Sequence, residues 1–237
     1  MINLFALILL IPSKIVGKTN GENWIGLIDG FYSIVLTLLV IELPVIILEM
    51  IEKIMLVGNF QKELWESIIT LTVLLLGYFA IFTIIYDIWS YHKTLLFGAK
   101  RLRVFAITTG FILFLSSLAP PFYYLVNHYA LEEVLGEFDH HPSMILASTA
   151  VFVIIGIIYL FLAALAKSEK RHPGQTPEKR EELRYMLESS STKALITVII
   201  ATITSSPNMY LPPPTGITAL AIITYFPINF FKKRHRM

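Results

Sequence analysis

Residues 27–44 read LIDGFYSIVLTLLVIELP, an apolar run long enough to cross a lipid bilayer as a helix. Asp29 lies in its first turns, and a carboxylate at the edge of the hydrocarbon layer usually has a partner or lines a water-filled path. Ile34, Leu38 and Ile41 follow at spacings of i, i+4 and i+7, so they share one stripe of the helix. Repeated around a symmetry axis, this stripe would form stacked apolar rings, which can gate a pore by dewetting. The stretch predicts a membrane protein and favours a channel.

The composition of the whole chain agrees with a membrane location. Hydrophobic residues make up 55% of the 237 residues and charged residues 15%, with a mean hydropathy of +0.68. A soluble domain rarely reaches such values. The sequence has no cysteine, which excludes disulfides and thiolate metal sites, and it lacks common hydrolase and nucleotide-binding motifs. Asp139, His140 and His141 are adjacent in an acidic loop, which is weak support for a metal site. We therefore expect no catalytic residues, no bound metal and no cofactor.

Apolar stretches of about 20 residues predict six membrane-spanning helices and an all-α integral membrane protein. The predicted spans are residues 24–44, 65–89, 104–126, 144–166, 194–210 and 215–231. Pro120 and Pro121 are expected to break or kink the third span near one end. The last two spans are short and rich in Thr, so a re-entrant hairpin is the alternative. Residues 1–23 are predicted to lie at the membrane interface, and residues 232–237 form a basic tail.

The positions of the basic residues give the chain an orientation. If the N-terminus lies in the cytoplasm, six spans place all but Lys53 and Lys62 of the 19 Lys and Arg residues on the cytoplasmic side. This distribution follows the positive-inside rule, and it predicts that both termini are cytoplasmic. Residues 167–193 would then form a cytoplasmic connector, in which Thr176 caps a charged, solvated helix. Contact of its basic side chains with anionic lipid headgroups is the lesser alternative.

Polar residues near the predicted cytoplasmic ends of the first two spans suggest a second site. Asp87, Trp89 and His92 close the second span on the same face as Asp29, so a contact between Asp29 and His92 is possible. Such a pair could lock two helices together or sense pH. A solvated His92 beside an interfacial aromatic belt is equally open, and Asp29 could instead act as a helix-capping group. Gly30 permits close approach of a neighbouring helix.

Three motifs in the first half of the chain match a known signature. The signature begins with Arg-x-x-x-Phe-Ser-Asp-Gly-x-x-Ala, which Asp29 and Gly30 match, with Ser33 in place of the small Ala. It continues with Ile-x-x-Thr-Leu-Leu-Val, which Ile34 and the run Thr37–Val40 match. The residues Trp89, His92, Leu96 and Phe97, and then the segment 118–122, fit two further elements of the same signature. The chain thereby resembles the transmembrane protein 175 family, potassium-permeable channels of lysosomes and prokaryotes. Asn23 stands where the family has Arg, and Leu27 and Ile28 replace its Phe and Ser.

The resemblance implies a six-helix subunit that assembles as a homotetramer, with the first helix lining the pore. It assigns Ile34, Leu38 and Ile41 to the pore constriction and Thr37 to a polar selectivity layer. It also implies a polar network of Asn23, Asp29 and His92, with Gly30 and Trp89 in helix packing. The sequence contains no Thr-Val-Gly-Tyr-Gly motif, so a selectivity filter made of carbonyl rings is not expected.

The resulting hypothesis is a potassium-permeable cation channel of the cell membrane that passes potassium in preference to sodium. Its partners would be K+ ions, the lipid bilayer and further copies of the same chain, and no nucleic acid. Two alternatives remain open. One is a proton-coupled secondary transporter that uses Asp29, Asp87 and His92 as proton carriers. The other is a non-conducting membrane scaffold, in which the first helix only packs against its neighbours.

Overall fold

The computed structural model describes residues 21–56, 60–97, 99, 102–134, 142–204 and 216–223. Every regular element in these ranges is a helix, which confirms the predicted all-α class for this part of the chain. The long helices are α3 (Gly21–Leu56), α4 (Phe60–Leu96), α5 (Leu102–Val134), α6 (Pro142–Lys170) and α7 (Pro177–Thr204). Residues 216–223 form a shorter helix.

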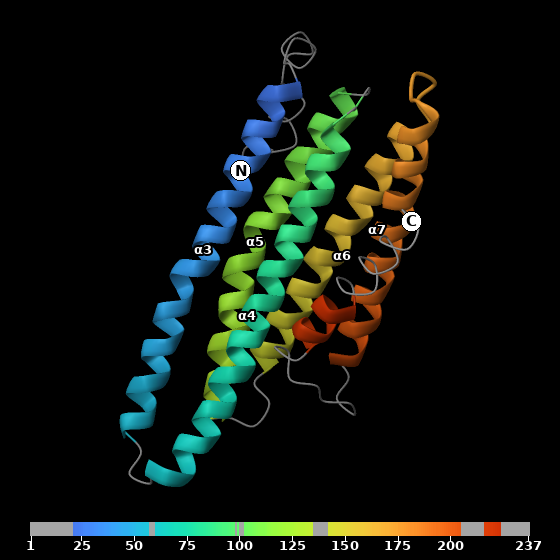
Figure 1. Cartoon of the computed structure of the whole chain (residues 1–237). Coiled ribbons are helices and arrows are strands. Elements are labelled where there is room, and N and C mark those ends of the chain that lie inside the picture. Colours follow the sequence, from blue (N-terminus) through green and yellow to red (C-terminus); the bar gives the residue numbers. More distant parts are fainter. Residues whose placement is uncertain are drawn as a thin grey trace, which may run out of the picture.

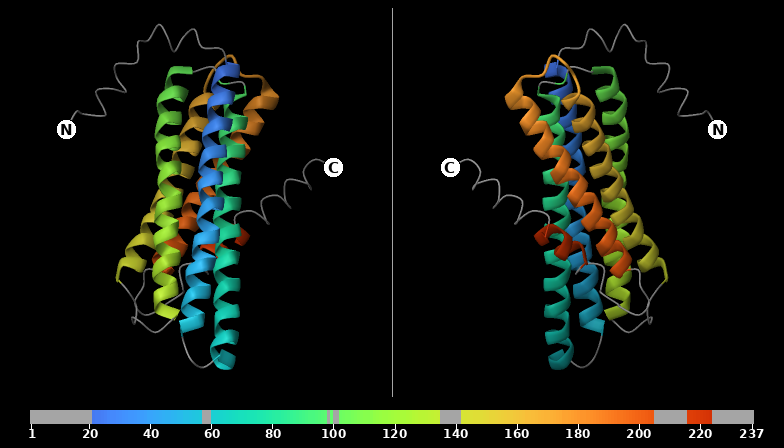
Figure 2. Two further views of the ribbon diagram at one scale, coloured as in Figure 1. Left: turned by 90° about the vertical axis from the view of Figure 1, so that its left-hand side faces the viewer. Right: turned by 90° about the vertical axis from the view of Figure 1, so that its right-hand side faces the viewer.

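The five long helices run alternately up and down in an elongated bundle (Figure 1). Helix α3 packs against α4 and α5, and α6 lies between α5 and α7 and also contacts α4. One end of the bundle carries the beginning of α3, the end of α4 and the turn between α6 and α7. Figure 2 shows the same bundle from its two sides. This alternation is the arrangement that successive membrane crossings require.

Within the described ranges, four helices contain segments long and apolar enough to cross a membrane: Trp24–Val45, Phe105–His128, Ile145–Lys170 and Pro177–Thr204. They correspond to the first, third, fourth and fifth predicted spans. Helix α4 covers the second predicted span, and residues 216–223 lie within the sixth. The total of six spans and the cytoplasmic placement of both termini stay predictions. The interfacial segment 1–23, apart from its last three residues, and the basic tail 232–237 lie outside the described residues.

Several helices continue past the predicted ends of their spans. Helix α3 runs through Pro44 to Leu56, and α5 runs through Pro120 and Pro121 to Val134. Proline removes one backbone donor, and contacts with neighbouring helices make that loss tolerable in membrane bundles. At 36 residues α3 is about 54 Å long, well beyond the roughly 30 Å of a hydrocarbon core. One end of α3 therefore extends beyond the bilayer core.

Helix α7 begins well before the predicted fifth span. The backbone N–H of Lys179 donates to Thr176 Oγ1 at 3.3 Å, which is the predicted cap at a helix start. From Pro177 the helix continues without interruption into the apolar stretch that ends at Thr204. The predicted connector 167–193 therefore comprises the end of α6, a turn and the first half of α7.

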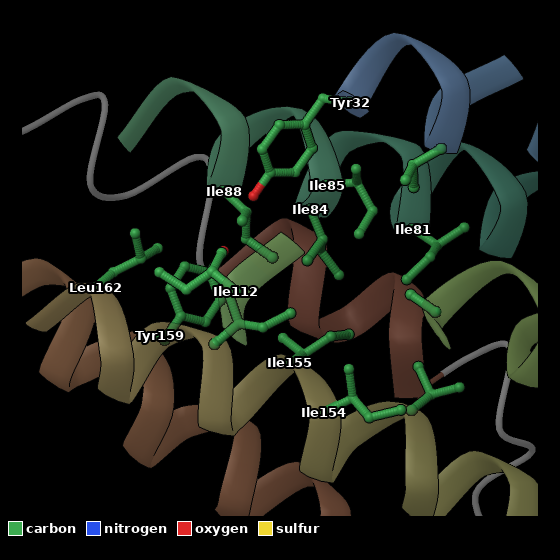
Figure 3. Packing of buried hydrophobic residues seen from close by; sticks show 14 of the residues in the cluster. Tyr32, Ile81, Ile84, Ile85, Ile88, Ile112, Ile154, Ile155, Tyr159 and Leu162 are labelled. Carbon is green, nitrogen blue, oxygen red and sulfur yellow. The ribbon is translucent and has the colours of Figure 1, made fainter. Parts of the chain in front are cut away.

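Isoleucine and aromatic side chains fill the centre of the bundle. Figure 3 shows Ile84 and Ile88 of α4 pointing toward Ile155 and Tyr159 of α6. All four are almost completely buried. Burying an aliphatic or aromatic side chain in such close packing maximises its dispersion contacts with neighbouring helices. This core fixes which face of each helix points inward and which points outward.

Candidate functional site

The residues predicted to constrict a pore lie on one exposed face of α3. Ile34, Leu38 and Ile41 are 61%, 44% and 60% exposed, and comparably exposed apolar side chains also lie on other helices, such as Leu160 of α6 at 56%. Thr37 is exposed beside them, and its hydroxyl donates to the backbone carbonyl of Ser33 at 2.7 Å. The structure therefore groups the four residues on the surface of a single copy.

The opposite face of α3 is fixed in the bundle. Ile28, Tyr32, Val35 and Leu39 are each no more than 1% exposed. Their spacing of i, i+4, i+7 and i+11 forms the stripe by which α3 packs on α4 and α5. Because this stripe is buried, the rotation of α3 is set within one copy, and the Ile34 face must point away from the bundle.

The exposed face extends further along α3 than the sequence analysis proposed. Leu27, Ile34, Ile41 and Leu48 recur every seven residues and are all at least half exposed. A seven-residue apolar repeat is the pattern by which helices pack against one another in a common seam. Leu27 and Leu48 were missed because the prediction considered one membrane-length window, whereas the repeat could have been read from the sequence. The repeat suits contact with α3 of another copy.

Asp29 connects α3 to α4. Trp89 Nε1 donates to one carboxylate oxygen of Asp29 at 2.7 Å, and Lys93 Nζ lies 2.8 Å from the other. The Lys93 ammonium also lies 4.9 Å from the centre of the Trp89 ring. Trp89 and Lys93 are one turn apart and share the face of α4 that meets α3. Helix packing by Trp89 was predicted, whereas the role of Lys93 was not.

His92 belongs to a separate, fully buried cluster between α3, α4 and α5. Its Nε2 lies 2.9 Å from Thr109 Oγ1 of α5, and its Nδ1 lies 3.4 Å from the Tyr32 hydroxyl. The Tyr32 hydroxyl also lies 3.5 Å from Ser116 Oγ. His92 points toward α5 while Trp89 and Lys93 point toward Asp29, so the described contacts do not pair Asp29 with His92. Tyr32, Thr109 and Ser116 carry no motif that would have singled them out.

For two other predicted site residues, Asn23 and Gly30, the structure describes no side-chain contact. Asn23 lies in α3, but its side chain is outside the part of the chain that the structure describes. Gly30 is exposed, and no atom of the described neighbours lies within 4 Å of a Cβ added there. The described residues therefore show no close helix approach at Gly30. The adjacent residues Asp139, His140 and His141 are outside the described ranges.

A third polar group lies between α4, α6 and α7. Asp87 accepts hydrogen bonds from the Tyr159 hydroxyl at 2.8 Å and from Lys193 Nζ. Lys193 is only 1% exposed, although the sequence analysis placed it in a solvated connector. The error arose because Lys193 follows a run of charged residues, while the continuous α7 carries it into the bundle. Asp29, Asp87 and His92 thus each have their own partners on different helix faces.

These observations define a class: a helical membrane protein with one packed helix whose exposed face is an apolar, Thr-containing seam. Comparison with known families gives a match over part of the chain. Residues 25–120, from α3 through slightly more than the first half of α5, match the model of the family described as Endosomal/lysosomal potassium channel TMEM175. The resemblance found in the sequence is confirmed over these residues. No curated protein and no solved structure matches the chain.

Proposed function

We propose that this protein is a potassium-permeable cation channel of the cell membrane, whose pore is lined by α3 from four copies of the chain. The observation that carries this proposal is the exposed apolar face of α3, which lies within the residues that match a potassium channel family. Helix α3 packs on α4 and α5 by one face and leaves its apolar Ile34 face exposed. Such a helix can line a symmetric pore with the same residues from each copy.

The side chains of that face would control passage. Rings of Ile34, Leu38 and Ile41 would narrow the pore, and a narrow apolar ring excludes water and ions until it widens. Thr37 would supply a polar layer between them. Its hydroxyl hydrogen is already used by the Ser33 carbonyl, so its remaining lone pairs are available to a cation. A modest preference for potassium over sodium fits such a weakly coordinating layer.

The contacts behind α3 would keep this face in place. Trp89 and Lys93 hold Asp29 near the beginning of the helix, and Tyr32 enters the His92 cluster one turn later. Both sets of contacts come from the side opposite the pore face. Because polar contacts are directional, they resist rotation of α3 more strongly than apolar packing alone.

A proton-coupled transporter would need Asp29, Asp87 and His92 to exchange protons along one path. Each of these groups instead has a separate set of partners: Lys93, Lys193 and Thr109, respectively. This separation favours the channel proposal over the transporter.

The test is potassium flux through purified protein in liposomes, comparing Ile34→Asn with Leu160→Asn. Leu160 of α6 is 56% exposed and serves as a control of similar exposure away from α3. A polar ring at position 34 should raise the flux about tenfold if it lowers the barrier by about 1.4 kcal/mol, whereas Leu160→Asn should leave the flux unchanged. Equal flux in both variants and the parent would contradict a pore lined by Ile34.

A further inference from the structure

The buried pair of Lys193 and Asp87 has no role in the pore described above. The Lys193 side chain is 1% exposed and that of Asp87 is 13% exposed, and both lie in helices of an apolar bundle. Removing two opposite charges from water costs about as much as their attraction returns, so such a pair is weak evidence for stability. Ionisable groups in this setting more often have a functional partner or position one.

Aromatic and hydroxyl groups surround the pair on three helices. The Lys193 ammonium lies 4.3 Å from the centre of the Tyr91 ring and 5.5 Å from that of Tyr159. The Tyr91 hydroxyl lies 2.6 Å from Ser189 Oγ. Cation–π contacts and directional hydrogen bonds thus hold Lys193 in one place. They make the meeting of α4, α6 and α7 geometrically specific.

Three contacts join α7 to α4 in antiparallel order. Lys179 Nζ donates to the backbone carbonyl of Thr94, at 3.3 Å. Further along α7, Ser189 meets Tyr91, and Lys193 then meets Asp87. The contacts therefore fix both the height and the rotation of the last turns of α4 relative to α7.

The same turns of α4 hold α3. Trp89 and Lys93, which bind Asp29, lie two and six residues after Asp87. A short stretch of one rigid helix thus contacts α7 on one side and α3 on the other. A displacement of Asp87 would be transmitted to Trp89 through less than one helical turn.

We propose that Asp87 and Lys193 are positioning residues of the pore: their ion pair sets the rotation of α4, from which Trp89 and Lys93 orient the Ile34 face of α3. This inference rests on the proposed channel function for its consequence, but the orientation of α3 can be measured without any current. Loss of the pair should let α3 turn, exposing residues now packed and burying part of the pore face.

The absence of cysteine from the sequence allows a clean test. Ile34→Cys and Val35→Cys place single thiols on the exposed and buried faces of α3, because Ile34 is 61% and Val35 1% exposed. Full-length protein in liposomes is treated with a small membrane-permeable methanethiosulfonate, and the labelling rate at position 35 is divided by that at 34. Adding Lys193→Met to each background should raise this ratio at least threefold.

Two controls distinguish a rotation of α3 from a general destabilisation of the helix bundle. Arg184→Met breaks an exposed ion pair with Glu188 on the same helix, 2.9 Å long, and should leave the ratio unchanged. Ala147→Cys reports a buried site on α6, where labelling should not rise when Lys193 is replaced. If Lys193→Met does not fold, the double variant Asp87→Asn with Lys193→Met removes both charges and replaces it.

An unchanged ratio in the folded Lys193→Met or double variant would overturn the proposal. A parallel rise at position 147 would overturn it as well, because the pair would then act only on stability. Potassium flux is recorded on the same samples. If the parent protein passes no potassium but Lys193→Met still raises the labelling ratio of positions 35 and 34, the positioning role is supported and the channel function is rejected. Failure of the positioning proposal can therefore be told apart from failure of the channel proposal.

Discussion

Several buried polar side chains of the bundle have partners on other helices, and His92 shows why this matters. His92 is completely buried, and its Nε2 lies within hydrogen-bonding distance of one hydroxyl, that of Thr109 on α5. A buried polar atom that loses its partner retains its full desolvation penalty. The His92 cluster therefore depends on an exact hydroxyl position as well as on shape.

Thr109→Val should lower the free energy of unfolding by about 1–3 kcal/mol, because it leaves the His92 ring nitrogen unpaired with almost no change in volume. The matched control is Thr202→Val, at an exposed threonine of α7 whose hydroxyl donates only to its own helix. That variant should stay within about 0.5 kcal/mol of the parent. Unfolding of detergent-solubilised protein provides the measurement. Equal effects of the two substitutions would refute a special role for Thr109.

The sequence specified element types better than side-chain partners. Apolar stretches located helices α3 to α7, and the i, i+4, i+7 pattern placed Ile34, Leu38 and Ile41 on one stripe of α3, which the structure shows to be exposed. The partner of Asp29 could not be predicted from the sequence, since His92 and Lys93 are adjacent and only the rotation of α4 decides which of them meets Asp29. Lys193 was misassigned for a similar reason, because composition does not show that a charged helix enters the bundle.

At the scale of elements, the short helix 216–223 is seated on α6 and α7 through a glycine. A Cβ added at Gly216 would lie 2.5 Å from Cγ2 of Thr204 and 3.3 Å from Cζ of Phe152. Thr204 cannot easily move, because it is buried and its hydroxyl is bonded to the carbonyls of Ile200 and Ala201. Only glycine allows this approach.

Gly216→Ala should therefore destabilise the protein by about 1–3 kcal/mol, the usual effect of overpacking. Adding Thr204→Ser removes the obstructing methyl group but keeps the hydroxyl, and it should restore most of the lost stability. Gly110→Ala is the control, since nothing lies within 4 Å of a Cβ added there. Thermal unfolding of the three variants checks this prediction. Failure of Thr204→Ser to rescue Gly216→Ala would show that the contact is not the cause.

At the scale of the whole molecule, a single copy leaves one apolar face of α3 uncovered by its own helices. The bundle buries one face of α3 and leaves an apolar seam from Leu27 to Leu48 on the other. Large contiguous apolar surfaces usually mark an interface or contact with lipid. Completion by other copies would turn this seam into the wall of a pore, and the polar contacts of Asp29 and Tyr32 behind it would hold that wall in position.

The most direct test of this account is the reversal potential of the purified protein in a planar bilayer, with potassium on one side and sodium on the other. A potassium channel lined by α3 should give discrete single-channel currents that reverse toward the potassium equilibrium potential, and larger currents for Ile34→Asn. Folded protein that passes no current, either as the parent or as Ile34→Asn, would contradict it.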